Sequence, residues 1–167
     1  NGNYIGGIDV KNTINWTISD NVFIGIQGRT REGRAGIYIS ENGRGCTIQR
    51  NIFIDCDIAI ALGNPSLGYS PLQPIDCVPQ NNFVSECPET GILACFTRNC
   101  QILGNTIHDP LSRRKRLIWV QKSNAGLRVK DNLLFGPPIQ VTSDSEIDQS
   151  GNVVHSELAQ WTAEQNP

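Results

Sequence analysis

Residues 48–53 read Ile-Gln-Arg-Asn-Ile-Phe, and this stretch decides the fold because its pattern recurs along the chain. In five places an asparagine has an aliphatic residue three positions before it and an apolar residue two positions after it. Together with a sixth that lacks the full frame, the recurring residues are Asn21, Asn51, Asn81, Asn105, Asn132 and Asn152. They are separated by 30, 30, 24, 27 and 20 residues, and self-similarity at such a period is typical of solenoids.

The frame predicts a strand on each side of every asparagine, because apolar residues two positions apart lie on one face of a strand. Asparagine tolerates the left-handed backbone of a tight turn, and its amide can stack on the asparagine of the next coil. A third apolar segment follows each frame, at residues 36–39, 59–62, 91–94, 117–120 and 138–141. We therefore predict an all-β, single-stranded parallel β-helix of about five to six coils with an Asn ladder.

Composition supports one β-rich domain over residues 1–167. The chain has 20 Ile and 9 Val against 11 Leu, and β-branched residues favour strands. The net charge of −2 gives no general attraction to nucleic acid or anionic membranes. No apolar run reaches the length of about 18 residues that a membrane span needs. We predict neither a nucleic-acid partner nor a membrane span.

Both ends of the chain depart from the repeat. Residues 7–10 already look like the middle of a coil, so we expect this chain to be the C-terminal part of a longer solenoid. Residues 154–167 are expected to form a C-terminal cap or tail, with Ser156 as a helix N-cap and Trp161 on the apolar side of a short helix.

Six cysteines allow fifteen full pairings, among which the sequence does not choose. Cys56 and Cys87 fall at nearly the same place in successive coils. They are therefore expected to be either stacked free thiols or a disulfide bridge. Two interpretations of the cysteines remain open. They form disulfides in an oxidising, extracytoplasmic compartment, or they are free thiols that pack as small hydrophobic residues in the core. A zinc site is disfavoured, because there are no paired Cys-x-x-Cys segments and His108 and His155 fall in different coils.

The chain resembles the pectate-lyase-like right-handed parallel β-helix superfamily, in its branch of secreted bacterial repeat proteins. The resemblance spans residues 4–154 and is carried by residues 46–53, 100–107 and 127–134, each followed by the third strand. It implies a right-handed helix, a secreted or periplasmic location, and a carbohydrate cleft over the first sheet. In this chain we expect the first sheet to be formed by the third apolar segment of each coil. The expected outward residues of that sheet run from Gly7, Asp9 and Lys11 through Gly36, Tyr38 and Ser40, Ala59, Ala61 and Gly63, Gly91, Leu93 and Cys95, and Leu117, Trp119 and Gln121 to Pro138, Gln140 and Thr142.

Charge on this expected face lies at its N-terminal end. Asp9 and Lys11 would project beside Tyr38, as the last members of a catalytic site shared with upstream coils or as solvated strand residues. A lyase of uronic acid polymers needs a base and a cation, such as calcium or arginine, that stabilises the developing charge.

His108 and Asp109 lie in a turn, and we take them as further catalytic candidates. A second candidate binding region follows this turn. Four cations at residues 113–116 precede Trp119. Guanidinium groups pair with carboxylates and an indole can stack on a sugar ring. Arg113, Arg114, Arg116, Trp119 and Tyr38 are therefore the candidate substrate-binding residues, the alternative for the cationic run being a solvated loop.

Asp55 and Asp109 occupy equivalent positions two coils apart, roughly 10 Å, near the wide limit for an inverting hydrolase. Aspartate is also a common turn former and calcium ligand, so calcium is the one cofactor considered. The sequence thus predicts a carbohydrate-active protein, a lyase or hydrolase of acidic polysaccharide with most of its catalytic machinery upstream. The alternative is a non-catalytic carbohydrate-binding, adhesive or structural solenoid.

Overall fold

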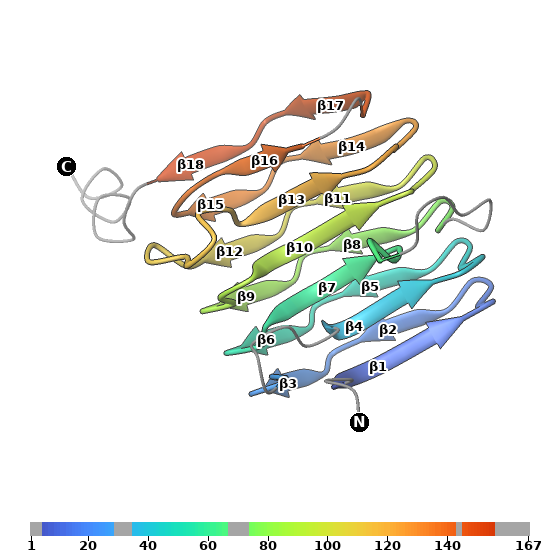
Figure 1. The fold of residues 1–167 in the computed structure, drawn as a ribbon, viewed down its shortest axis with the longest axis horizontal. Coiled ribbons are helices and arrows are strands. Elements are labelled where there is room, and N and C mark those ends of the chain that lie inside the picture. The colour runs from blue at the N-terminus through green and yellow to red at the C-terminus, as the bar shows by residue number, and fades with distance from the viewer. Residues whose placement is uncertain (1–4, 29–34, 67–73, 143–144, 156–167) are drawn as a thin grey trace.

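The protein is a parallel β-helix, described by a computed structural model for residues 5–28, 35–66, 74–142 and 145–155. Its strands form three six-stranded sheets (Figure 1). The first sheet contains β1 (Gly6–Lys11), β4 (Ala35–Ser40), β7 (Ile58–Leu62), β10 (Thr90–Cys95), β13 (Ile118–Gln121) and β16 (Ile139–Val141). The second contains β2 (Thr17–Ser19), β5 (Thr47–Gln49), β8 (Val78–Gln80), β11 (Gln101–Leu103), β14 (Leu127–Lys130) and β17 (Ile147–Ser150). The third contains β3 (Val22–Ile24), β6 (Ile52–Ile54), β9 (Phe83–Ser85), β12 (Thr106–His108), β15 (Leu133–Phe135) and β18 (Val153–His155).

Each coil contributes one strand to each sheet, and neighbouring strands are parallel and in register. The third repeated segment forms the first sheet, as the sequence predicted. Equivalent residues therefore line up in rows across the coils, for example Asp9, Tyr38, Ala61, Leu93, Trp119 and Gln140. Within the described residues, no helix is long and apolar enough to cross a membrane.

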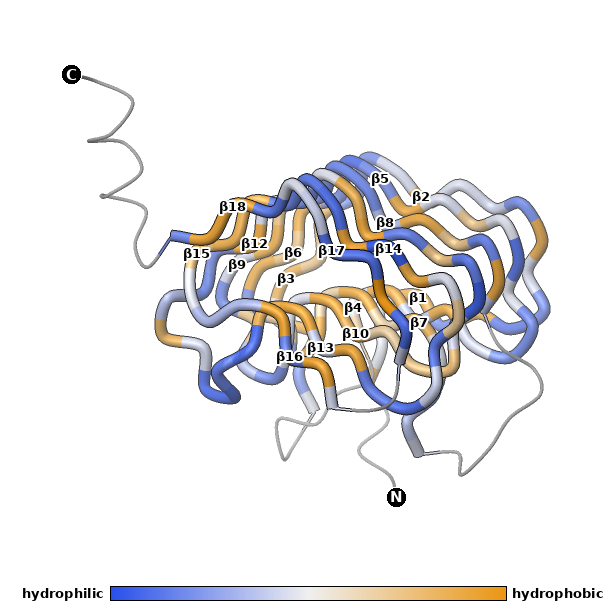
Figure 2. Tube along the Cα trace, turned by 90° about the horizontal axis from the view of Figure 1, so that it is seen from above, coloured by the Kyte–Doolittle hydropathy of each residue, from blue (hydrophilic) through white to orange (hydrophobic). Residues whose placement is uncertain are grey.

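The core is a column of aliphatic and aromatic side chains enclosed by the three sheets. The strands carry most of the hydrophobic residues, whereas the turns at the corners are mainly hydrophilic (Figure 2). Phe53 and Ile60 are fully buried, and Phe53 stacks on Phe23 of the preceding coil with ring centroids 4.9 Å apart. Burial of this column is the main stabilising term, as expected for a solenoid whose coils contact only their neighbours.

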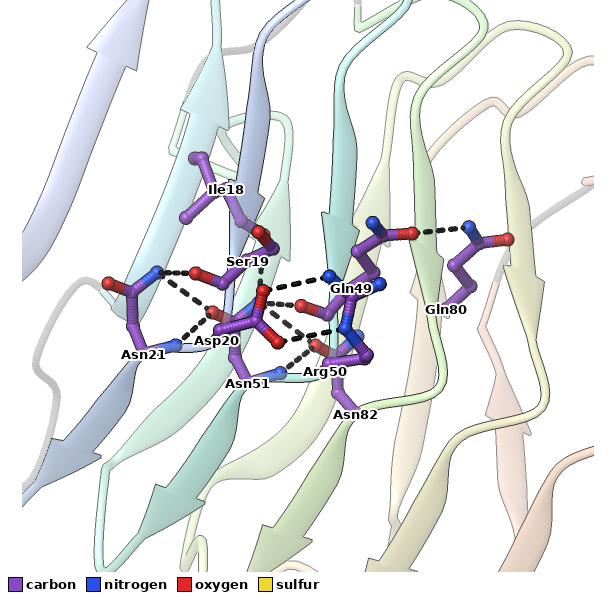
Figure 3. A network of polar contacts seen from close by, with 9 residues as sticks. All are labelled: Ile18, Ser19, Asp20, Asn21, Gln49, Arg50, Asn51, Gln80 and Asn82. Carbon is purple, nitrogen blue, oxygen red and sulfur yellow. Dashed lines mark hydrogen bonds and ion pairs between the residues drawn. The ribbon is translucent and has the colours of Figure 1, made fainter.

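The Asn ladder lies between the second and third sheets, but one of its members differs from our prediction. The ladder consists of Asn21, Asn51, Asn82, Asn105, Asn132 and Asn152, and each Nδ2 donates to the Oδ1 of the next asparagine at 2.9–3.1 Å. The backbone N–H of each asparagine donates to the same Oδ1. Figure 3 shows the first three members. The prediction of Asn81 is wrong, because Asn82 occupies that step.

The residue before each ladder asparagine makes the left-handed bend, so two neighbouring residues share the roles that we assigned to one. This row is Asp20, Arg50, Asn81, Gly104, Asp131 and Gly151, all with φ between 53° and 67°. Asn81 is the exposed residue of the bend, and Asn82 beside it is 2% exposed. Asn81 fits the sequence frame better than Asn82, because Val78 precedes Asn81 by three positions whereas Pro79 precedes Asn82.

The expected outward rows of the first sheet also need a correction. Ala59 and Leu117 belong to the core, and a Cβ added to Gly36 or Gly91 would lie 2.8 Å from the core side chains of Phe53 or Ile107. The first residue of the expected row therefore faces inward in these four coils, although Gly36, Ala59 and Gly91 already lie within β4, β7 and β10. The two later rows, which contain Tyr38 and Cys95, do face outward.

At the C-terminal end, the expected cap at 154–167 begins too early. Val153–His155 form β18, the last strand of the third sheet. Ser156 and Trp161 lie outside the described residues.

Two glycines with positive φ give a direct test of how closely the coils stack. Gly63 has φ of 83°, and a Cβ there would lie 1.8 Å from the Cys95 carbonyl oxygen. Gly25 has φ of 67° but nothing within 4 Å of an added Cβ. We expect Gly63→Ala to lower the free energy of unfolding by at least about 2 kcal/mol. Gly25→Ala should cost only the backbone strain of roughly 1 kcal/mol, as measured by urea denaturation. Equal losses would contradict the close approach of the coils at Gly63.

Candidate functional site

The centre of the outer face of the first sheet, where the resemblance implied a cleft, is filled. Tyr38, Ala61 and Leu93 are only 1–2% exposed and pack with Cys95 and Phe96 in a second apolar cluster. Burial raises the pKa of the Cys95 thiol to about 12. A buried tyrosine does not present its ring to a sugar, so Tyr38 is not part of an open binding surface.

The two charged candidates at the N-terminal end lie on β1, three coils away from His108 and Asp109. Asp9 pairs in register with Tyr38 on the neighbouring strand. Lys11 is exposed and forms a 2.7 Å ion pair with Glu41. The structure therefore does not bring the four catalytic candidates into one site.

The cationic run forms an internal network around a buried glutamate that the sequence did not single out. Arg114 Nε donates to both carboxylate oxygens of Glu89 at 3.1–3.2 Å, and Arg116 Nη2 lies 3.8 Å from Glu89 Oε2. The Arg116 guanidinium lies 3.3 Å from the centroid of the Trp119 ring, and the indole N–H donates to Thr142 Oγ1 at 3.1 Å. Burial lowers the pKa of Arg116. Two of the three arginines and one face of the indole are thus already engaged within the protein.

A row of carboxylates follows the corner between the third and first sheets. The corner residues of successive coils are Gly25, Asp55, Glu86, Asp109 and Gly136, linked by backbone hydrogen bonds from each coil to the next. Each lies four positions after its ladder asparagine. Asp55 and Asp109 are therefore equivalent residues two coils apart, as predicted, and Glu86 lies between them.

These carboxylates line a cleft of about 420 Å³ whose other walls are Gln27, Pro88, Leu111 and Arg113. Gln27 Nε2 donates to Asp55 Oδ1 at 2.6 Å. Asp109 is 8% exposed, and desolvation, with the nearby charge of Glu86, raises its pKa. The cleft thus combines two exposed carboxylates, Asp55 and Glu86, a largely buried one, Asp109, and one guanidinium.

Of the predicted site residues, the structure brings Asp109 and Arg113 together in this cleft. It also adds Glu86 and Gln27, which our sequence analysis missed. Glu86 was hidden by the register error, since it lies five residues after Asn81 but four after Asn82. Gln27 lies in a turn without a repeat signal, so its contact with Asp55 could not be predicted.

His108 lies on the outer face of the third sheet, although Asp109 next to it lines the cleft. Its ring packs against Phe135, with centroids 5.8 Å apart, and His155 packs against Phe135 at the same distance. The two histidines are therefore held apart by an aromatic ring.

All six cysteines are free and buried. Cys46, Cys77 and Cys100 occupy the same position in three successive coils. Cys56 and Cys87 are stacked neighbours, as one of our two alternatives had it. The hydrogen bond with Cys100, together with burial, raises the pKa of Cys77, and burial raises that of Cys87.

The three sheets, the Asn ladder and the corner cleft define a parallel β-helix protein. The model of the family described as periplasmic copper-binding protein (NosD) matches residues 1–142, and the chain belongs to this family. The family description agrees with the secreted or periplasmic location expected from the sequence. Comparison with curated proteins and with solved structures gave no significant match.

The family description raises the question of whether this chain can hold copper. Copper in proteins is bound by thiolate, thioether or imidazole groups. The chain has no methionine, its histidines are separated by Phe135, and its six cysteines are buried. Among the described residues, no three His, Cys, Asp or Glu side chains are grouped to hold a metal ion. The described residues do not fit a copper centre.

Proposed function

We propose that this chain is a carbohydrate-binding β-helix domain and that the glycan lies in the corner cleft. The observation that carries the proposal is the row of Asp55, Glu86 and Asp109, one carboxylate per coil, along a cleft of about 420 Å³. Such a row offers acceptors at the regular spacing of the coils, roughly 4.8 Å, to a polymer that lies along the helix axis.

The chemistry of the lining suits sugar hydroxyls. Carboxylates accept hydrogen bonds from hydroxyl groups, and Arg113 supplies donors. Pro88 and Leu111 give an apolar wall, and Leu111 is 91% exposed. The excess of carboxylates favours neutral or cationic glycans. This differs from the acidic polysaccharide expected from the cationic run, because Arg114 and Arg116 are paired with Glu89.

Hydrolysis is a second candidate function. It is favoured by the different burial of two carboxylates, since Asp55 is exposed and Asp109 is largely buried. An inverting hydrolase uses a carboxylic acid of raised pKa and a carboxylate base about 6.5–9.5 Å apart. Asp109 has the raised pKa, and Asp55 lies roughly two coil rises, or about 10 Å, away, which is at the wide limit of that separation. In this role Asp109 would protonate the leaving oxygen and Asp55 would activate water.

The test uses oligosaccharides of chitosan, chitin, cellulose, mannan and pectate. Binding is measured by titration calorimetry, and cleavage is measured by the release of reducing ends. We expect binding of at least one neutral or cationic glycan and no binding of pectate. The variant Asp55→Asn/Asp109→Asn should weaken this binding at least about tenfold, since each lost charged hydrogen bond contributes about 1.5–3 kcal/mol.

Asp76→Asn is the matched control, because Asp76 is an exposed aspartate with φ of 54°, the same as Asp55, at a different corner. This variant should bind as the wild type does. Binding of pectate alone, or equal losses in the control and the double variant, would contradict the cleft as the glycan site. If the wild type releases reducing ends and Asp109→Asn does not, the domain is a hydrolase. Binding without cleavage would establish a binding domain.

A further inference from the structure

A column of three thiols runs through the corner between the first and second sheets. Cys46, Cys77 and Cys100 occupy the same place in successive coils, and each is fully buried. Their register follows from the strands that come next, since β5 pairs with β8 and β8 pairs with β11, all in parallel. Neighbouring parallel strands lie roughly 4.8 Å apart, within the Cα separation of about 4.4–6.8 Å that a disulfide spans. Neighbouring thiols of this column are therefore close enough for a covalent bond between coils.

Within the column, Cys77 and Cys100 are the more closely coupled pair. The backbone N–H of Cys77 donates to Cys100 Sγ at 3.4 Å, and the two side chains also form a hydrogen bond with one another. This side-chain hydrogen bond lowers the pKa of the Cys100 thiol, so Cys100 is the member that ionises first. The Cys46 sulfur has another neighbour, because Thr13 Oγ1 lies 3.4 Å from it. Of the two thiols beside Cys77, Cys100 has the larger influence on its pKa.

The other three cysteines are placed differently. Cys95 lies in the second apolar cluster, outside the core column that contains the remaining five. Cys87 Sγ donates to the carbonyl of Ser85 in its own coil at 3.6 Å, and Cys56 Sγ donates to the carbonyl of Ile54 at 3.6 Å. Within the described part of the chain, no hydrogen bond joins the sulfur atoms of Cys56 and Cys87. The contacts therefore single out one pair, Cys77 and Cys100.

We propose that Cys77 and Cys100 form a disulfide between two neighbouring coils when the chain folds in the periplasm, the compartment of its family. The oxidant is a protein disulfide of that compartment. The Cys100 thiolate attacks one sulfur of the oxidant, whose S–S bond breaks, and a mixed disulfide forms. Cys77 then loses its proton and attacks Cys100 Sγ, which releases the second sulfur of the oxidant. The two cysteines give up two electrons and two protons, and the oxidant leaves as two thiols.

The burial of both cysteines places this exchange before the coils close, because neither sulfur is accessible in the finished helix. The bond would close a loop whose ends are 23 positions apart and which contains β8, β9 and β10. A cross-link of this kind stabilises a protein mainly by restricting its unfolded chain. The proposal makes no use of the glycan cleft, so the two can be tested separately.

The test compares the full chain exported to the periplasm of a bacterial host with the same chain retained in the reducing cytoplasm. Free thiols are alkylated in denaturant, and proteolysis with mass spectrometry locates any cross-link. We expect the exported chain to contain a Cys77–Cys100 cross-link and to lack the mass of two hydrogen atoms. Its midpoint of urea denaturation should be higher and should return to that of the cytoplasmic chain after reduction. An exported chain that keeps all its thiols, or a cross-link that joins other cysteines in place of this pair, would overturn the proposal.

Two variants of the same column provide matched controls. Cys46→Ala and Cys100→Ala each remove one thiol beside Cys77 and make the same change of size in the core. The exported Cys46→Ala variant should keep the cross-link and the raised midpoint, whereas Cys100→Ala should lose both. Circular dichroism confirms that each variant is folded, and the map of the wild-type chain decides the question even if one variant does not fold. Loss of the cross-link in Cys46→Ala, or its retention by Cys77 in Cys100→Ala, would contradict the proposed pair.

Discussion

Replacing Asn82 with leucine is expected to lower the free energy of unfolding by about 3–5 kcal/mol, because each buried polar group left unpaired costs about 1–3 kcal/mol. Asn82 Oδ1 accepts from the backbone N–H and the Nδ2 of Asn51, at 3.0 and 3.1 Å. Asn82 Nδ2 donates to Asn105 Oδ1 and to the carbonyl of Ile48, both at 2.9 Å. Leucine has a similar size, so the loss measured by chemical denaturation would report the missing hydrogen bonds.

The control for this prediction is the neighbouring residue. Asn81→Gly keeps the left-handed bend at φ of 53° and removes only an exposed side chain. Its stability should stay within about 1 kcal/mol of the wild type. If Asn81→Gly proved the more damaging of the two, the ladder would run through Asn81, as the sequence frame first indicated. The pair thus tests the one register error in our sequence analysis.

The fold could be predicted because its determinants are local and repeated. An aliphatic residue before each asparagine and an apolar one after it specify two strands and the bend between them, and five copies of the frame reinforce each other. The error at Asn81 shows the limit of this reasoning. β8 contains Pro79 in the inward position that isoleucine or valine takes in most other coils, so the frame fitted better when it was shifted by one residue.

The candidate site could be predicted only in part, because it depends on contacts between turns. Asp55 and Asp109 were found through their repeat position, which the backbone fixes. Whether the outer face of the first sheet is open depends on what packs over Tyr38 and Leu93, and no period in the sequence encodes that. The pairing of Arg114 and Arg116 with Glu89 joins residues 25 and 27 positions apart in turns of different length. The cationic run therefore looked like a binding surface, although two of its four cations, Arg114 and Arg116, belong to an internal network.

That network leads to the second large effect. Glu89→Gln is expected to lower the free energy of unfolding by about 3 kcal/mol, because removing one partner of a buried ion pair leaves the other charge uncompensated. The side chains of Glu89 and Arg116 are each 11% exposed, so solvent screens their interaction little. The loss of charge would also leave Arg114 and Arg116 facing one another without a counter-ion. The measurement is denaturation, together with the NMR signal of the Trp119 indole N–H, which should shift as Arg116 moves.

A double-mutant cycle separates the ion pair from packing. Arg116→Met keeps an extended apolar side chain against Trp119, so Glu89→Gln should cost clearly less in that background than in the wild type. Asp20→Asn is the exposed comparison, since the 2.8 Å pair of Asp20 with Arg50 is open to solvent and should contribute no measurable stability. Equal costs of Glu89→Gln in both backgrounds would mean that Glu89 acts through its neighbours in β10 rather than through Arg116. A reduced cost would show that Arg116 stabilises the entry of the chain into β13 through Glu89, which explains why Arg114 and Arg116 are held against the β-helix while Arg113 lines the cleft.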